Sequence, residues 1–417
     1  MSRTALNAVR NIVPREETTT NNDETGAPAS GVYSQAFPPM SALDRFMDHM
    51  LKMDASDLYL TVGSPPVFRT AGVGLKGKKP VTTEQIDAMF EEALSDAQKI
   101  QFDLTCELNF AAARGDGRYR VNVFKQRGEK GMVIRLVRTR IKTLDEMGYP
   151  AVMKEISLSR RGLVLVVGGT GSGKSTALAA MIDHRNSTET GHILTIEDPI
   201  EFIHPHKSCV VTQREMGVDT LSVEAALKNA LRQAPDVVLI GEIRDRRTME
   251  AALELAETGH LCISTLHANN ADQAVERVLN FFPSDRHAEV RSHLALNLRA
   301  VVSQRLVPTV DGKRAAALEI MVDTPRVKQL IKSGDVSSLK DAMEQSAGEG
   351  CQTFDGSLFD LFAAGRVSAE AALKASDSPN NVRLRIDRWK ESGGHVTSDS
   401  HEPPLRLLPD SRLDVGH

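Results

Sequence analysis

Apolar residues in the middle of the chain gather in short segments that are separated by helical patterns. Four such segments are 162–167 (GLVLVV), 192–196 (HILTI), 236–240 (DVVLI) and 260–266 (HLCISTL). Strands that are apolar on both faces are typical of a parallel sheet that helices cover on both sides. The pattern therefore predicts an α/β domain with a parallel sheet. Further helices that form an α-helical end are expected near 324–332, 336–347, 355–364 and 368–375.

The first part of the chain has a different pattern, in which apolar and polar residues alternate. Residues 118–123 (RYRVNV) alternate strictly, which predicts a half-buried strand with Arg118 and Arg120 on its polar face. Residues 82–94 form an amphipathic pattern, and Thr82 and Gln85 have the spacing of a capping box. Other strands are expected at 57–62, 66–72 and 132–137. These elements predict a small α+β domain.

Changes in composition divide the chain into segments. Both ends are polar and Pro-rich, with too few large apolar side chains to order themselves. We therefore expect a disordered arm, the small domain, a linker, the α/β domain with its C-terminal helices, and a disordered tail. Their boundaries are 1–40, 41–140, 141–150, 151–387 and 388–417.

Composition and charge exclude several classes of function. The 417 residues carry a net charge of −4 and only 4% aromatic residues, which argues against a nucleic-acid partner. No apolar run near the glycine-rich motif approaches the ~20 residues of a membrane-spanning helix, and the N-terminus does not resemble a secretory signal. We expect no transmembrane segment and a cytoplasmic protein. The four cysteines, Cys106, Cys209, Cys262 and Cys351, are too scattered to indicate a zinc or redox motif.

A glycine-rich motif follows the first apolar strand and precedes a helical segment. Residues 168–175 (GGTGSGKS) match the phosphate-binding loop pattern G-x-x-x-x-G-K-[ST] in the strand–loop–helix context that the pattern requires. Backbone N–H groups and the helix N-terminus would hold the phosphates of ATP, with Lys174 at the β- and γ-phosphates, Ser175 on Mg²⁺ and Thr176 beside the α-phosphate. The predicted nucleotide-binding residues are Gly168, Gly169, Thr170, Gly171, Ser172, Gly173, Lys174, Ser175 and Thr176.

Polar side chains follow the other apolar strands. Ligands of an open α/β sheet bind beyond the carboxyl ends of its strands. One strand ends in Glu197, Asp198 and Glu201, another in Glu242, and a third in His267. We expect Glu242 to organise Mg²⁺ and the attacking water, Glu201 to help position that water, and His267 to contact the γ-phosphate. Asp236 and His260 lie at the opposite ends of strands, where a structural role is expected.

Four stretches of the chain together resemble a known family. GGTGSGKST, TIEDPIEF, RQAPDVVLIGEIRD and ETGHLCISTLHANNA resemble the Walker A, Asp box, Walker B and His box of the secretion ATPase superfamily. Within it the chain is similar to the type IV pilus retraction ATPases of the PilT/PilU group, over about residues 41–387. The stretches RQAPD, RVKQLIKSG and the C-terminal end favour the PilU type. The resemblance implies a RecA-like P-loop domain preceded by a PAS-like domain.

The resemblance also implies an assembly and a function. Its members form homohexamers with ATP between subunits and power pilus retraction and twitching motility. It implies a PilT-type paralogue and an inner-membrane platform protein as partners, and a position at the inner membrane through the pilus machinery. The motifs of the P-loop domain include no obvious arginine directed at the γ-phosphate. Arg118, Arg120 and Arg135 of the small domain are therefore candidates to act in trans or, alternatively, to form surface ion pairs.

Three other functions are considered. A pilus-assembly or type II/IV secretion ATPase would usually carry a longer N-terminal region and a tetracysteine zinc element, which this sequence lacks. The small net charge and the low aromatic content argue against a nucleic-acid translocase. A scaffold that does not hydrolyse ATP disagrees with the intact acidic residues at the strand ends.

Overall fold

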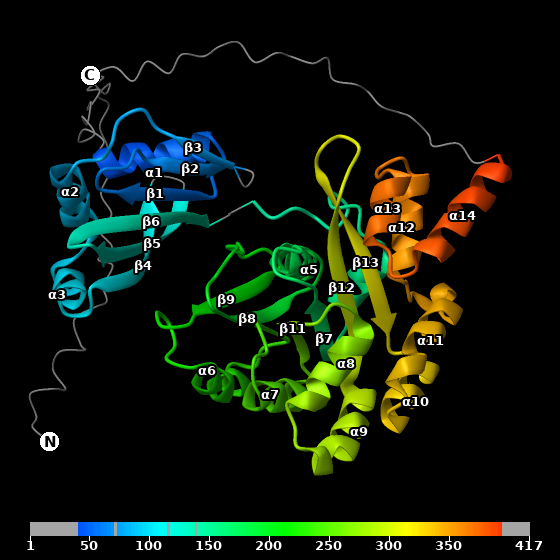
Figure 1. The fold of residues 1–417 in the computed structure, drawn as a ribbon. Coiled ribbons are helices and arrows are strands. Elements are labelled where there is room, and N and C mark those ends of the chain that lie inside the picture. The colour runs from blue at the N-terminus through cyan, green and yellow to red at the C-terminus, as the bar shows by residue number, and fades with distance from the viewer. Residues whose placement is uncertain (1–40, 71–72, 115–116, 138–139, 394–417) are drawn as a thin grey trace, which may run out of the picture. The chain divides into compact units, whose positions relative to one another are not determined.

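The computed structural model describes residues 41–70, 73–114, 117–137 and 140–393, and within them two separate β-sheets (Figure 1). The predicted arm at 1–40 and residues 394–417 of the predicted tail lie outside the described residues. None of the helices in the described part of the chain has the length and apolar content that a membrane crossing requires.

The first sheet is antiparallel and has the order β3-β2-β1-β6-β5-β4. Its strands are β1 (Asp57–Thr61), β2 (Val67–Thr70), β3 (Val73–Lys76), β4 (Glu107–Arg114), β5 (Gly117–Gln126) and β6 (Glu129–Val137). Its helices are α1 (Ala42–Lys52), α2 (Thr83–Ala93) and α3 (Asp96–Thr105). The predicted strands and the capping box of Thr82 and Gln85 on α2 are present.

The alternation along β5 separates a core face from an arginine face. Tyr119, Val121 and Val123 are at most 1% exposed and pack with the helices, and the hydroxyl of Tyr119 donates to Met47 O at 2.9 Å. Arg118 is exposed on the other face. A change at Arg118 therefore removes no core contact.

The second sheet has seven strands in the order β13-β12-β7-β11-β10-β8-β9, all parallel except β13. They are β7 (Gly162–Val167), β8 (Gly191–Glu197), β9 (Cys209–Glu215), β10 (Val237–Ile240), β11 (Leu261–Leu266), β12 (Leu298–Pro308) and β13 (Arg314–Val322). The predicted α/β domain with a parallel sheet is confirmed, with one antiparallel edge strand added to it.

Helices cover both faces of this sheet, as the buried side chains of β7 show. Leu163, Leu165 and Val167 belong to one apolar cluster, while Val164 and Val166 belong to the other. The first cluster includes side chains from α7 (Arg246–Glu257), α8 (Ala271–Asn280) and α9 (His287–Asn297), and the second from α4 (Val152–Ser157) and α5 (Lys174–Thr188). A short helix, α6 (Val223–Ala230), packs with the first. Burial on two faces explains the continuous apolar character of these strands.

The segment expected to be a linker is partly a component of the α/β domain. Leu144 and Tyr149 are 1% and 7% exposed and pack in the cluster that contains Val164 and α5. The polar residues between them form a hydrogen-bonded turn, with Tyr149 N donating to Leu144 O at 3.0 Å. The prediction of a linker over 141–150 is therefore wrong for residues 144–149.

The C-terminal end is helical, as predicted, and extends further than expected. It contains α10 (Pro325–Ser333), α11 (Leu339–Gln345), α12 (Phe354–Ala363), α13 (Ala369–Ala375) and α14 (Pro379–Glu391). The helix α14 continues to Glu391, so the proposed start of the tail at 388 is wrong. Its buried residues Val382 and Ile386 pack with β12, β13 and α12.

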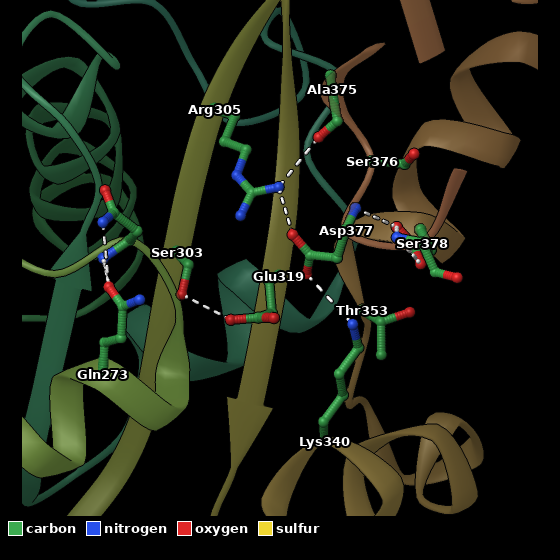
Figure 2. A network of polar contacts seen from close by, with 12 residues as sticks. Gln273, Ser303, Arg305, Glu319, Lys340, Thr353, Ala375, Ser376, Asp377 and Ser378 are labelled. Atoms are coloured by element: carbon green, nitrogen blue, oxygen red, sulfur yellow. Dashed lines mark hydrogen bonds and ion pairs between the residues drawn. The ribbon is translucent and has the colours of Figure 1, made fainter. Parts of the chain in front are cut away.

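Ion pairs and hydrogen bonds between side chains connect these helices to β12 (Figure 2). Arg305 Nη1 donates to Asp377 Oδ1 at 2.6 Å and to Ala375 O at 3.0 Å, and its guanidinium lies over the ring of Phe354. Lys340 Nζ lies 3.3 Å from the other oxygen of Asp377. One aspartate thus joins β12 to α11 and to the loop before α14.

Candidate active site

The loop between β7 and α5 needs its glycines for backbone conformation and for space. Gly171 and Gly173 have φ of +76° and +91°, in the left-handed region that favours glycine. A Cβ atom on Gly173 would lie 2.7 Å from Gln304 Nε2, and one on Gly168 would lie 2.6 Å from Gln304 O. Close packing against β12 therefore constrains both ends of the loop.

Lys174 is the first residue of α5 and lies back over the loop. Its Nζ donates to Gly168 O at 2.9 Å and to Gly169 O at 3.0 Å. Burial lowers the pKa of Lys174, and the carboxylates of Glu242 and Glu201 oppose that shift. A partly desolvated cation beside a turn of backbone N–H groups is suited to bind phosphate.

The P-loop and the strand ends line one cleft of about 350 Å³. Thr170, Gly171, Lys174 and Ser175 line it from the loop and α5. The polar side chains that line it at the ends of β8, β10 and β11 include Glu197, Asp198, Glu201, Glu242, Arg244 and His267. Gly168 and Gly169 line a neighbouring pocket together with His267. The structure thus brings together side chains from four strand ends that the sequence places up to a hundred residues apart.

Glu242 is held by a cation or hydrogen-bond donor at each oxygen. His267 Nε2 lies 2.8 Å from Oε1, and Arg244 Nε donates to Oε2 at 2.7 Å. Arg244 Nη1 also lies 3.7 Å from Asp198 Oδ2, so it connects two strand ends. Arg244 had no predicted role, although it lies inside the stretch GEIRD.

The three carboxylates at the end of β8, Glu197, Asp198 and Glu201, have different environments. Glu201 is exposed at the rim of the cleft. Glu197 is more enclosed: Thr195 Oγ1 donates to Oε1 at 2.6 Å and Gln213 Nε2 at 3.1 Å, while burial raises the pKa of Glu197. Asp198 faces Arg244. Glu201 and Asp198 are both exposed, so both carboxylates are accessible to water in the cleft, whereas Glu197 is not.

The candidate arginines lie on the small sheet, and none of them lines this cleft. Arg135 of β6 donates from Nε to Asp57 Oδ1 at 2.8 Å, which is the ion pair that the alternative interpretation expected. Arg120 is directly opposite Arg135 in the β5–β6 register, and its Nη2 lies 3.3 Å from Glu215 Oε1. Arg118 is exposed.

Residues expected to be structural have structural contacts. Asp236 accepts a hydrogen bond from His192 N at 2.8 Å, at the amino end of the sheet. His260 Nδ1 lies 3.1 Å from Thr258 Oγ1. The cysteines are unpaired, and three of the four are buried.

Gln304 is, with Arg244, a residue of the site that could not be identified from the sequence. It is 1% exposed on β12, a strand that was not predicted, and its Nε2 donates to Ser172 O in the P-loop at 2.8 Å. No sequence pattern identifies it, because its contact with the loop depends on β12 pairing with β7.

Comparisons with known proteins agree with this geometry. A family model described as "Type II/IV secretion system protein" matches residues 81–368. The chain is 48% identical over 371 residues to the type IV pilus ATPase PilU of Pseudomonas aeruginosa. This alignment covers 88% of this chain and 97% of that protein. It is 43% identical over 332 residues to the retraction ATPase PilT of the same organism, covering 79% and 96%.

A solved structure extends the similarity to three dimensions. The pilus retraction motor PilT with bound ADP matches with a TM-score of 0.76 at 35% identity, covering 83% of this chain and all of that chain. The region that the family model matches includes strands of both sheets. The comparisons confirm the resemblance to the PilT/PilU group, and the structure confirms the expected order of a small domain followed by an α/β domain.

Proposed function

The chain belongs to the type II/IV secretion system protein family, and we propose that it is an ATP-hydrolysing motor of type IV pilus retraction that works with a PilT-type paralogue. The observation that carries the proposal is the meeting of Lys174 and Glu242 in one cleft at the carboxyl edge of the sheet. The identity of 48% over 88% of this chain with the PilU relative, against 43% over 79% with the PilT relative, supports the PilU type.

The P-loop is the proposed site of ATP. The residues 168–176 supply backbone N–H groups, the N-terminus of α5 and the ammonium of Lys174. Bound ADP in the PilT structure supports the use of a nucleotide by this chain. We propose that the triphosphate replaces the loop carbonyls as the partner of Lys174.

The cleft also offers ligands for Mg²⁺. Magnesium in nucleotide sites is held by one or two protein oxygens together with phosphate oxygens and water. The hydroxyl of Ser175 and the carboxylate of Glu242 line the same cleft and are oxygen donors of this kind. When bound, the ion would neutralise charge on the phosphates.

Glu242 is the residue proposed to orient the attacking water. Its carboxylate is fixed by His267 and Arg244, which limits its rotation. Glu201 at the rim is a second candidate for holding this water. Since His267 already contacts Glu242, we propose that it transmits the presence of the γ-phosphate to Glu242.

The assembly is proposed to be a homohexamer with the nucleotide between subunits. Arg118 or Arg120 of one subunit would then reach the site of its neighbour, as arginines supplied in trans do in other NTPases. The proposed location is the cytoplasmic side of the inner membrane, through a platform protein of the pilus machinery. The PilT-type paralogue would share the work of retraction.

A test in cells separates retraction from assembly. The gene carrying Lys174→Ala is placed at the native locus, alone and in a strain that lacks the PilT-type paralogue. We expect surface pili to persist or increase while twitching decreases, because assembly does not depend on this site. A strain without surface pili would instead identify an assembly ATPase.

A further inference from the structure

The side chain of Gln304 connects the P-loop to a segment outside the nucleotide site. Its Nε2 donates to Ser172 O at 2.8 Å, and its Oε1 accepts from the hydroxyl of Tyr149 at 3.0 Å. Gln304 and Tyr149 are 1% and 7% exposed. Three segments that are distant in sequence are therefore joined by two buried hydrogen bonds.

The contact of Gln304 with the loop is tight at both ends of the loop. Its side-chain nitrogen would be 2.7 Å from a Cβ on Gly173, and its backbone oxygen would be 2.6 Å from a Cβ on Gly168. Movement of Gln304 therefore cannot leave the loop unchanged. The backbone that turns toward the phosphates is packed directly against this residue.

The hydroxyl of Tyr149 determines the orientation of the side-chain amide of Gln304. With the hydroxyl as donor, the amide carbonyl is satisfied and the NH₂ group faces Ser172 O. Without that donor the carbonyl is buried and unpaired, and a flipped amide would place two oxygens against each other. An unpaired buried acceptor is unfavourable, so the loop would lose a fixed partner.

Tyr149 belongs to the segment that leads from the small sheet into the ATPase domain. Residues 143–149 form a turn, with Met147 N bonded to Thr143 O at 3.1 Å and Gly148 N to Asp145 O at 2.9 Å. The aromatic ring packs in the same apolar cluster as Leu144 and Met153. The position of the hydroxyl is thus set by this turn.

We propose that Tyr149 and Gln304 are positioning residues that fix the P-loop for nucleotide binding and couple it to the turn at 143–149. The inference rests on the proposed function of the P-loop as the nucleotide site. A loop that is already ordered loses less conformational freedom when a ligand binds. By linkage, a nucleotide that orders the loop must also stabilise the turn.

The first test measures nucleotide affinity in the full-length protein. Tyr149→Phe removes one hydroxyl and keeps the ring, and we expect the Kd for ADP and the KM for ATP to rise about fivefold to tenfold with kcat nearly unchanged. The matched control is Tyr119→Phe, which removes a buried hydroxyl that donates to Met47 O in the small domain. We expect this control to lower the Tm without changing the Kd.

A second pair of variants tests whether the two residues act together. Gln304→Leu should raise the Kd at least as much as Tyr149→Phe, and adding Tyr149→Phe to it should have no further effect. In the wild-type protein, ADP should slow hydrogen exchange of the backbone amides at 143–149. In the Gln304→Leu variant, saturating ADP should leave this exchange rate unchanged.

Two results would overturn the proposal. One is a Tyr149→Phe protein whose Tm falls as that of the control does while its Kd for ADP stays at the wild-type value. The other is hydrogen exchange at 143–149 that does not respond to ADP in wild-type protein. Wild-type protein that binds no nucleotide would overturn the proposed function and this inference with it.

Discussion

The carboxylate of Glu242 is the best-defined chemical group of the cleft, because both of its oxygens have a partner. Its position at the end of a parallel strand could be predicted, since the carboxyl ends of such strands share one edge. Its partners could not be predicted. His267 was expected to face the γ-phosphate, and the contact with Glu242 depends on side-chain conformations that no spacing in the sequence encodes.

Replacing Glu242 with Gln should separate binding from turnover. The amide keeps the shape and loses the charge that organises Mg²⁺ and water, so we expect ATP to bind while kcat falls by about a hundredfold or more. Isothermal titration and steady-state hydrolysis measure the two quantities. The control is Glu250→Gln, which alters an ion pair with Arg246 and Arg286 away from the cleft and should leave kcat unchanged. A Glu242→Gln protein that is folded but binds no ATP would contradict this role.

Replacing Lys174 with Ala should abolish hydrolysis and preserve the fold. In the described part of the chain, the hydrogen bonds of its ammonium go to two loop carbonyls, so the change removes no core packing. Circular dichroism and the Tm should therefore stay close to wild type, while phosphate release falls to background. Hydrolysis at the wild-type rate would show that the nucleotide site lies elsewhere.

At the scale of elements, the strands of the second sheet were predicted where a continuous apolar run marks them and missed where polar residues interrupt it. The strands β7, β8, β10 and β11 lie inside the sheet, and each contains a run of at least four buried residues, most of which are apolar. The edge strand β9 (CVVTQRE) is half polar, and β12 contains Gln304 and Arg305. Their polar side chains serve contacts made only in the folded protein, which hides the strand pattern.

Helices with a small buried face were missed for a related reason. Only Phe102 of α3 is buried, and only Val382 and Ile386 of α14. One or two apolar positions do not establish a helical period. These helices depend on packing against neighbours that the local sequence does not reveal.

The contact between β13 and α8 predicts a pH-dependent stability. Glu319 of β13 is 3% exposed, and its Oε1 accepts a hydrogen bond from Ser303 Oγ at 3.0 Å (Figure 2). The same oxygen accepts a second hydrogen bond from Ala271 N at 2.7 Å. Burial raises the pKa of Glu319 from its ordinary value of 4.5 to about 7, and the charges of Asp272 and Asp377 act in the same direction. A raised pKa means that the folded state prefers the protonated acid. The contribution of Glu319 to stability is therefore full below pH 4.5 and lost as the pH rises to about 7.

Glu319→Gln removes this ionisation and keeps an oxygen that can accept both hydrogen bonds. We expect the variant to gain stability relative to wild type at pH 8, by up to about 3 kcal/mol, and to gain little at pH 5. Thermal unfolding of both proteins at the two pH values gives the comparison. Glu344→Gln, an exposed position on α11, is the control and should show no such difference. An equal loss of stability at both pH values would mean that the ionised carboxylate is the better partner of α8.

At the scale of the whole molecule, the order of the domains was predictable and the boundary between them was not. Polar residues at 141–150 indicated a linker, but Leu144 and Tyr149 occupy the core of the ATPase domain. Two apolar residues in a short polar segment do not show which core they join. How subunits complete the site is likewise not encoded in one chain's local patterns.

The last prediction concerns the assembled ring, in which one subunit is proposed to supply an arginine to the nucleotide site of its neighbour. Arg118 is exposed and Arg120 lies on the same face of β5, so replacing either by Ala should leave the small domain folded. Arg135 is paired with Asp57 at 2.8 Å, a shorter contact than the 3.3 Å between Arg120 and Glu215, which makes Arg135 the weakest of the three candidates. If Arg118 or Arg120 acts in trans, its loss should reduce turnover about 10³-fold or more with little change in ATP affinity. Arg127→Ala, in the turn between β5 and β6, is the control.

Mixing subunits tests the geometry of this arrangement directly. A subunit that lacks the arginine keeps its P-loop, and a Lys174→Ala subunit keeps its arginine. In a mixed ring, some interfaces therefore join an intact P-loop to an intact arginine, and activity should partly recover although each variant alone is inactive. Differently tagged subunits that co-purify establish that exchange has occurred. If exchange is shown and no activity returns, the arginine does not act across the interface. Its role is then to form ion pairs within its own subunit, as Arg120 does with Glu215.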